Sequence, residues 1–191
     1  MNLKNCKLCQ FDENLSKVMT EFNCGNDDLN DFFHNDALNY SNELLGKTYC
    51  FISEKDNSIA CCFTICNDAL YIRPLPNSSK RTVRKNLPFS KYHKKYPAVL
   101  IGRIGVSEKF QHLHLGSQIL DFIKFWFLDK ENKTGCRFLT VDAYYPAIAF
   151  YERNGFQFLY KGEKDEKEQN GFSVEEKLRT RSMFFDLGIL R

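Results

Sequence analysis

Apolar residues recur at helical spacing along two segments of the chain. Over residues 27–44 and 116–130 they return every three to four positions, which predicts amphipathic helices that turn one side toward a core. Asn26 or Asp27 can cap the start of the first of these helices. A third helix is expected over 146–155, because this segment begins with a proline and ends with a glycine, the residues favoured at those two ends.

Shorter apolar runs rich in β-branched and aromatic residues predict strands. Residues 48–53 and 60–66 are separated by the turn sequence EKDNS, so we expect them to form a hairpin. The run YPAVLIGRIGV at 96–106 contains Gly102 and Gly105, and glycine inside a strand marks a bulge or a close approach of the backbone. Later strands are expected at 136–143, 156–160 and 180–187.

The order of these elements predicts an α/β protein with a mixed central β-sheet and helices on both faces. Strands and helices alternate in the second half of the chain, which favours parallel pairing there, whereas the hairpin favours antiparallel pairing earlier. A chain of 191 residues suits one domain spanning 1–191, and its 18 Phe and 9 Tyr provide a large apolar core. The hydrophobic content of 43% excludes a disordered chain.

No segment is predicted to cross a membrane. The longest apolar run, near Phe122, is interrupted by Asp121 and Lys124, and the first residues lack the apolar stretch of a signal peptide. We therefore expect a cytoplasmic protein whose eight cysteines are mostly reduced. Cys6 and Cys9 have zinc-ligand spacing, but without a second such pair we expect no metal site, and we interpret the remaining thiols as small buried hydrophobes.

The net charge of +3 is distributed unevenly along the chain. Residues 69–107 contain no Asp or Glu, whereas 163–176 are acidic. Part of the basic stretch, at about 72–96, contains three prolines and is interpreted as a long insertion with one short helix. It indicates a polyanionic partner such as nucleic acid, although a solvated loop, or one neutralised by the acidic segment, would have the same composition. The Lys and Arg residues of the whole stretch 69–107 are Arg73, Lys80, Arg81, Arg84, Lys85, Lys91, Lys94, Lys95 and Arg103.

The sequence QHLHLGS, at 111–117, forms a turn between the strand at 96–106 and the helix at 116–130. The first amides of a helix are free, and together with the helix dipole they favour a phosphate at such a turn. A bulge near Gly105 would leave strand backbone groups open to an extended ligand. A phosphate-bearing cofactor with a linear arm would use both features.

Two motifs resemble the GCN5-related N-acetyltransferase (GNAT) family over about residues 96–160. The family's turn Q/R-x-x-G-x-G/A is matched by Gln111, His114 and Gly116, with histidine in place of the usual glycine. The second motif is matched by Ala147, Phe150, Tyr151, Glu152, Gly155 and Phe156. The resemblance implies the GNAT fold, whose central sheet is splayed at a bulge, and acetyl-CoA as co-substrate.

The resemblance also implies a role for each matching position. The backbone of Ile104, Gly105 and Val106 would bond the pantetheine arm of acetyl-CoA and polarise the thioester carbonyl. Tyr151 would protonate the departing thiolate, although a helix tyrosine can equally be a packed core residue. The turn amides would hold the pyrophosphate, and the positions concerned are Gln111, His112, Leu113, His114, Leu115, Gly116 and Ser117.

The roles of the two histidines and the identity of the general base allow several interpretations. His112 and His114 could donate a hydrogen bond or a charge to the pyrophosphate, or point into solvent while only the amides bind. His114 could also weaken the cofactor site, because the family's glycine has no Cβ there. For the base we consider Asp142, Glu152 and Glu108, beside a chain of ordered water, without choosing among them.

Within the family, the chain most resembles the acetyltransferase toxins of toxin–antitoxin pairs. The resemblance rests on the segment FNCGNDDLNDFFHNDALNY, the basic insertion and the last predicted strand. It implies an aminoacyl-tRNA acceptor, an antitoxin partner and a homodimer. The residues expected to contact the RNA backbone are Lys80, Arg81, Arg84, Lys85 and Arg103. The alternatives are a small-amine or protein N-acetyltransferase, and a catalytically impaired nucleic-acid-binding module of the same fold.

Overall fold

The chain divides into two compact units, seen here in a computed structural model. The described residues are 2–87, 94–132 and 134–191. Unit 1 comprises Met1–Asn67 and Ile101–Phe125, and unit 2 comprises Asp68–Leu100 and Trp126–Arg191. Of the predicted basic insertion, residues 88–93, which include Lys91, lie outside the described residues.

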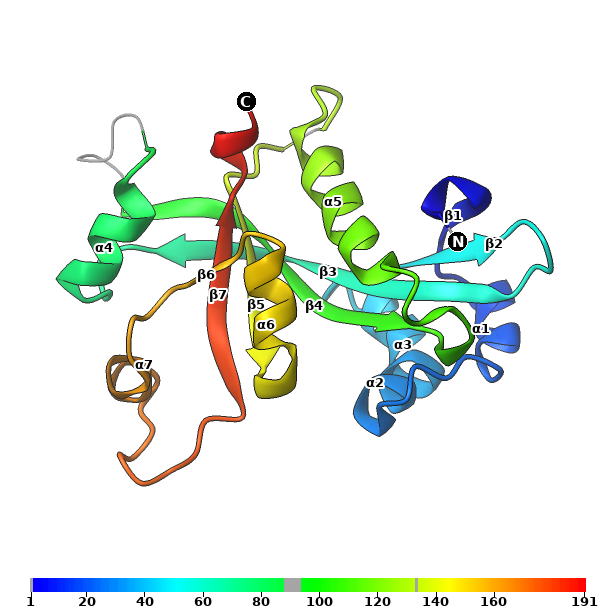
Figure 1. Ribbon diagram of the computed structural model, residues 1–191, viewed down its shortest axis with the longest axis horizontal. Coiled ribbons are helices and arrows are strands. Elements are labelled where there is room, and N and C mark those ends of the chain that lie inside the picture. Colours follow the sequence, from blue (N-terminus) through cyan, green and yellow to red (C-terminus); the bar gives the residue numbers. More distant parts are fainter. Residues whose placement is uncertain (1, 88–93, 133) are drawn as a thin grey trace. The chain divides into compact units, whose positions relative to one another are not determined.

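Unit 1 contains the predicted hairpin and the first helices (Figure 1). Its strands are β1 (Cys6–Gln10), β2 (Lys47–Ser53), the first part of β3 (Ile59–Tyr71) and the second part of β4 (Lys95–Val106). Its helices are α1 (Glu13–Met19), α2 (Asp27–Asp31), α3 (Ala37–Asn42) and most of α5 (Leu115–Leu128), with 3₁₀ turns at Leu3–Asn5 and Glu108–Phe110. β2 pairs antiparallel with both β1 and β3, which confirms the hairpin.

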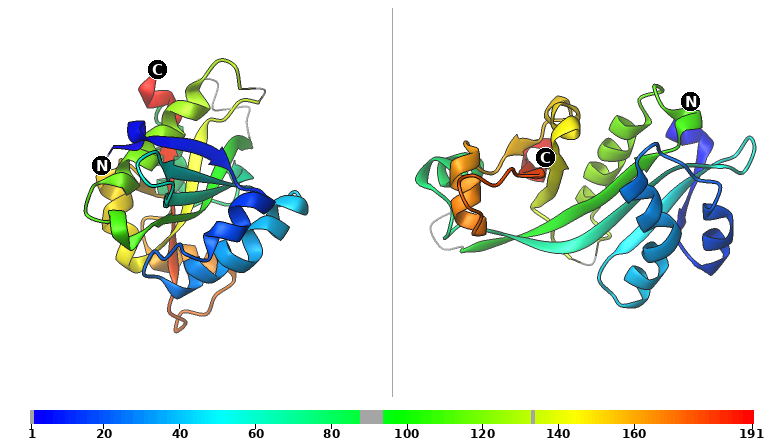
Figure 2. Two further views of the ribbon diagram at one scale, coloured as in Figure 1. Left: turned by 90° about the vertical axis from the view of Figure 1, so that its right-hand side faces the viewer. Right: turned by 90° about the horizontal axis from the view of Figure 1, so that it is seen from below.

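Neighbouring side chains of β2 point to opposite faces of unit 1, as the pleat of a strand requires. Cys50 lies in an apolar cluster with Phe32, Phe33 and other side chains of the α1–α3 region. Phe51 points to α5 instead, where its ring meets that of Phe122 edge-on at 5.2 Å. Figure 2 shows α1–α3 and α5 on the two faces of these strands.

The helix predicted at 27–44 is confirmed, with one irregularity. A π-helical turn, Phe32–Asp36, separates α2 from α3, and the helical segment ends at Asn42. The side chain of Asn26 caps its start by accepting a hydrogen bond from the Leu29 amide at 3.0 Å. The wider π turn lies where two consecutive phenylalanines are both buried.

Unit 2 contains the strand–helix alternation predicted for the second half of the chain. Its strands are the end of β3, the first part of β4, β5 (Phe138–Tyr144), β6 (Gln157–Phe158) and β7 (Thr180–Asp186). Its helices are α4 (Asn77–Arg84), the end of α5, α6 (Ile148–Arg153) and α7 (Glu163–Asn170), with 3₁₀ turns at Tyr145–Ala147 and Leu187–Leu190. β4 pairs parallel with β5, as expected for this half of the chain, but β7 pairs antiparallel with β5 and β6. The mixed sheet is confirmed, with most of these pairings antiparallel.

The parallel ladder between β4 and β5 is short. It ends at the Leu100–Thr140 pair, although β5 continues to Tyr144. The edge of β5 beyond Thr140 therefore has polar backbone groups outside that ladder. With all pairings included, the strand order is β1-β2-β3-β4-β5-β7-β6, an open α/β sheet of the predicted class.

The acidic segment at 163–176, expected as a loop, contains the helix α7. Its Glu166 side chain is 2% exposed and accepts hydrogen bonds from Arg181 Nε at 2.5 Å and from the Ser182 amide at 2.6 Å. The acidic segment is thus anchored to β7, and its buried carboxylate is paired with Arg181 rather than with the basic insertion. Within the described ranges, no helix is both long and apolar enough to cross a membrane.

Candidate active site

The turn at 111–117 has an unusual backbone. His112 and His114 have φ angles of +63° and +57°, while Leu113 between them is outside the positive-φ region. Left-handed conformations favour glycine, but histidine is among the residues that adopt them more readily than most. His114 therefore takes the backbone conformation open to the family's glycine, and both imidazoles are exposed. Successive residues of alternating backbone hand beside the start of a helix are a backbone arrangement that can form an anion site.

Two glutamine side chains fix the shape of this turn. Gln111 Nε2 donates to the Cys24 carbonyl at 2.9 Å and to the Val106 carbonyl at 3.2 Å, and its own amide donates to the Glu108 carbonyl at 3.3 Å. Gln118 Nε2 donates to the Leu113 carbonyl at 3.4 Å. The side-chain and backbone N–H groups of Gln111 are therefore engaged within the protein, where they hold the turn in position.

Gly105 lies where side chains approach the strand closely. A Cβ at this position would come within 3.0 Å of the Phe33 ring, 3.2 Å of the Phe22 ring and 3.4 Å of Cys24 Cβ. At Gly102 the nearest atoms are 3.8 Å away. Close approach thus explains the glycine at 105, whereas the bulge expected there stays a prediction.

Tyr151 is a buried residue of α6, with 7% of its surface exposed. Its ring packs edge-on against Phe150 at 5.1 Å and Phe156 at 5.4 Å. Its hydroxyl makes no hydrogen bond to other described residues, and burial raises its pKa well above the ordinary value of a phenol. The phenol is therefore protonated at neutral pH and has a proton to donate. The glycine after α6, Gly155, has φ +83°, as predicted for a residue just past a helix end.

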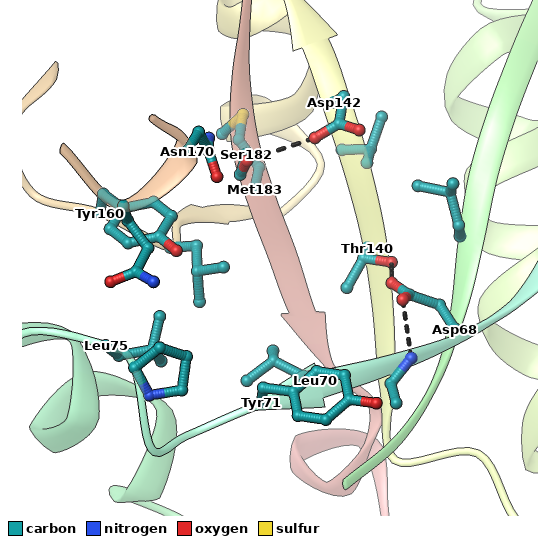
Figure 3. Close-up of a pocket in the computed structure, with 16 residues that line it drawn as sticks. Asp68, Leu70, Tyr71, Leu75, Thr140, Asp142, Tyr160, Asn170, Ser182 and Met183 are labelled. Atoms are coloured by element: carbon teal, nitrogen blue, oxygen red, sulfur yellow. Dashed lines mark hydrogen bonds between the residues drawn. The ribbon is translucent and has the colours of Figure 1, made fainter. Parts of the chain in front are cut away.

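Unit 2 contains a cavity of about 400 Å³ with an acidic and apolar lining (Figure 3). Thr140 Oγ1 donates to Asp68 Oδ2 at 2.5 Å, and Ser182 Oγ donates to Asp142 Oδ1 at 3.2 Å. Asp142 as a residue is exposed, but desolvation of its carboxyl in the cavity wall raises the pKa of that carboxyl, and the nearby Glu166 and Asp68 raise it further. Leucine and methionine side chains complete the wall, namely Leu70, Leu75, Leu100, Leu159 and Met183.

Asp142 and Tyr151 lie on opposite faces of the β5–β7 pair. Asp142 is opposite Ser182 in the ladder, and the pair Leu139–Phe185, three positions along it, points to the other face. Phe185 contacts Phe156 at 5.6 Å, and Phe156 contacts Tyr151.

Among the base candidates, Asp142 is the residue that lines a cavity. Glu108 accepts a hydrogen bond from Asn23 Nδ2 at 2.9 Å, and Glu152 is exposed on α6. Sequence reasoning missed Asp68, Thr140 and Ser182 altogether. The available signal was polar residues at alternate positions of apolar strands, as in FLTVDAY, which places Thr140 and Asp142 on one face.

Four of the five predicted RNA-binding residues lie on or at the end of one helix. α4 buries Ser79 and Val83, and its basic residues are half-buried or exposed. They are Lys80, Arg81, Arg84 and Lys85. Arg103 belongs to unit 1, where its guanidinium lies over the Phe32 ring at 4.8 Å. Cations near a helix C-terminus also interact favourably with the helix dipole, so their position alone does not require a ligand.

A family model for the acetyltransferase (GNAT) domain matches residues 47–158. Comparison with curated proteins gives no match. Among solved structures, the chain is similar to a tyrosine-to-phenylalanine mutant of KacT, with 19% identity, a TM-score of 0.71 and 97% of each chain covered. It is similar to AtaT complexed with acetyl-methionyl-tRNAfMet, with 17% identity, a TM-score of 0.66 and coverage of 97% of this chain and 96% of that chain. A mutant AtaT toxin bound to the C-terminus of the antitoxin AtaR and acetyl-CoA has 14% identity, a TM-score of 0.61 and coverage of 97% and 98%.

Proposed function

This chain belongs to the acetyltransferase (GNAT) domain family, and we propose that it transfers an acetyl group from acetyl-CoA to the amino group of an aminoacyl-tRNA. The turn at 111–117 would hold the pyrophosphate through its amides, because the left-handed residues His112 and His114 alternate with Leu113 beside the start of α5. The exposed imidazoles leave the amides as the binding groups.

The observation that carries the chemistry is the buried, protonated phenol of Tyr151. The acceptor amine attacks the acetyl carbonyl directly, so the C–N bond forms as the C–S bond breaks. The protonated acceptor first loses one proton to Asp142, which passes it to solvent, and the neutral amine then attacks. Tyr151 gives its proton to the departing sulfur, and the second proton lost by the nitrogen returns to the tyrosinate through solvent. The phenol is restored, and no covalent enzyme intermediate is needed because the amine attacks the acetyl carbonyl directly.

Two observations support tRNA as the carrier of the amine. Four Lys and Arg residues lie on α4 or next to its end, and such a cluster suits an RNA phosphate backbone. The similarity to AtaT, whose structure was solved with acetyl-methionyl-tRNAfMet, points to the same substrate class.

The structure of AtaT with the antitoxin AtaR likewise supports an antitoxin partner. A homodimer in the cytoplasm completes the proposal.

The test is transfer of radiolabelled acetyl from acetyl-CoA into a pool of charged tRNA, with spermidine and peptides assayed beside it. We expect label in the charged tRNA. A variant with Lys80, Arg81, Arg84 and Lys85 changed to Gln should bind tRNA more weakly. The slope of log binding constant against log salt concentration should also be smaller in magnitude by about one to four. The matched control changes four exposed lysines elsewhere, Lys4, Lys17, Lys130 and Lys164. Label confined to spermidine would instead favour a small-amine acetyltransferase, for which the acidic cavity would be the reason.

A further inference from the structure

Asp142 lies in the walls of two adjoining cavities of unit 2. The first is the acidic cavity of about 400 Å³, and the second has a volume of about 520 Å³. Asp142, Asn170 and Ser182 line both cavities. A ligand with two chemically different ends could therefore occupy both, with Asp142 at the junction.

The first cavity has the chemistry of an ammonium site with an apolar extension. The charged residues among its described lining are Asp68 and Asp142. Both oxygens of Asp68 are engaged, by the Ala69 amide at 2.7 Å and by the Thr140 hydroxyl. Asp142 accepts the Ser182 hydroxyl on Oδ1, and its Oδ2 accepts no hydrogen bond from the described residues. Asp142 is thus the carboxylate with an oxygen that can accept a hydrogen bond from a ligand, and leucine and methionine side chains line the same cavity.

The second cavity has the chemistry of a phosphate site. Its lining includes Lys177 and Arg179 together with two glutamates. Both glutamates have partners within the protein: Glu166 pairs with Arg181, and Glu176 accepts the Ser173 amide at 2.6 Å. With both glutamates engaged, the charges of this cavity that a ligand can neutralise are these two cations and the Asp142 carboxylate at the junction with the first cavity.

We propose that these two cavities bind the aminoacyl end of a charged tRNA. The ammonium group lies at Asp142 and an apolar amino-acid side chain lies in the first cavity, while the 3′-terminal phosphate lies at Lys177 and Arg179. This inference rests on the proposed function and specifies its acceptor as an aminoacyl group with an apolar side chain. A free polyamine would use the acidic cavity but would be repelled by the cations of the second.

The raised pKa of Asp142 gives the inference a signature that a structural role lacks. The groups facing this carboxyl are Asp68, Glu166 and the Ser182 hydroxyl. Its folded pKa lies above the unfolded value of about 3.9, so its favourable contribution to stability is present below that value and is lost as the pH rises through the folded pKa. Asn keeps an oxygen that can accept the Ser182 hydroxyl, so an Asp142→Asn variant should melt at about the same temperature while losing activity.

The experiment compares acetyl transfer to leucyl-tRNA and to leucinamide, a small amine with the same side chain and no phosphate. Asp142→Asn should lower kcat/KM for both acceptors by about tenfold or more, because a charge-assisted hydrogen bond is lost. Lys177→Gln with Arg179→Gln should lower kcat/KM for leucyl-tRNA alone. The controls are Asp36→Asn and a Lys161→Gln, Lys164→Gln pair, which change exposed residues outside both cavities. Binding of leucinamide is measured by calorimetry in parallel.

The outcomes separate this inference from the proposed function. If wild-type protein labels no charged tRNA but binds leucinamide through Asp142, the tRNA substrate is wrong and the ammonium site stands. If charged tRNA is labelled equally well by the Asp142→Asn and Asp36→Asn variants, the cavity assignment is overturned. Equal rates for glutamyl-tRNA and leucyl-tRNA would likewise overturn the apolar side-chain site, and failure of wild-type protein to bind leucinamide would overturn the ammonium site.

Discussion

The turn at 111–117 and the acidic cavity differ in which atoms are available to bind a ligand. In the turn, both histidines are exposed and have positive φ angles, and the proposed binding groups are backbone amides. In the cavity, Asp142, Thr140 and Ser182 present side-chain oxygens, and their backbones belong to the β5–β7 pair. A backbone site therefore tolerates a changed side chain if the φ angle is kept, whereas a side-chain site does not.

The largest effect is expected at Tyr151, a third place in the molecule, where a side-chain atom again does the chemistry. Tyr151→Phe should lower kcat by about 10² to 10⁴, the usual contribution of a positioned acid or base, and should leave acetyl-CoA affinity unchanged. Stability should change little, because the hydroxyl has no hydrogen bond to other described residues. Since burial raises the pKa of Tyr151, the wild-type rate should show no loss from its ionisation up to about pH 10, where a free phenol ionises. An unchanged rate in the variant would remove Tyr151 from the mechanism.

The next test concerns Glu166, in the wall of the second cavity. Glu166→Ala leaves Arg181, which is 8% exposed, without its carboxylate, so we expect a loss of about 3–5 kcal/mol in the free energy of unfolding. Glu168→Ala changes an exposed residue of the same helix and should cost at most about 0.5 kcal/mol. Chemical denaturation measures both. Equal stabilities would mean that α7 is not held by its buried ion pair.

A smaller effect is expected where the backbone itself is closely packed. Gly105→Ala should destabilise the fold by about 1–3 kcal/mol, because the new methyl group meets the Phe33 and Phe22 rings. Gly102→Ala is the control, since its nearest neighbours lie 3.8 Å away, and it should change stability by about 0.5 kcal/mol or less. Thermal melts of the two variants should therefore differ, and similar melting temperatures would contradict the packing argument.

The smallest effect is expected in the turn. His114→Gly should preserve acetyl-CoA affinity and raise stability by about 1 kcal/mol or less, because glycine adopts a positive φ without strain. Leu113→Gly, at the neighbouring position without a positive φ, should lower stability by a similar amount. Loss of acetyl-CoA binding in His114→Gly, measured by calorimetry, would show that the imidazole binds and that the turn is not a backbone site.

Most of the helices and strands could be predicted because their signals are local. The spacing of apolar residues over 27–44 and 116–130 identified α2, α3 and α5, and the glycine at 155 marked the end of α6. The π-helical turn and the helix within the acidic segment were missed. The first depends on packing around Phe32 and Phe33, and the second on the burial of Glu166 against Arg181, which lies 15 positions away in the chain.

The sequence by itself determined the elements, the family resemblance and the turn, because backbone conformation and motif spacing are set by residues close together in the chain. Only the tertiary structure decided that Asp68 and Thr140, 72 positions apart, share a hydrogen bond in the wall of one cavity. Asp142 and Ser182, 40 positions apart, meet there for the same reason. Strand pairing and side-chain packing bring such residues together, and neither leaves a periodic signal in the sequence.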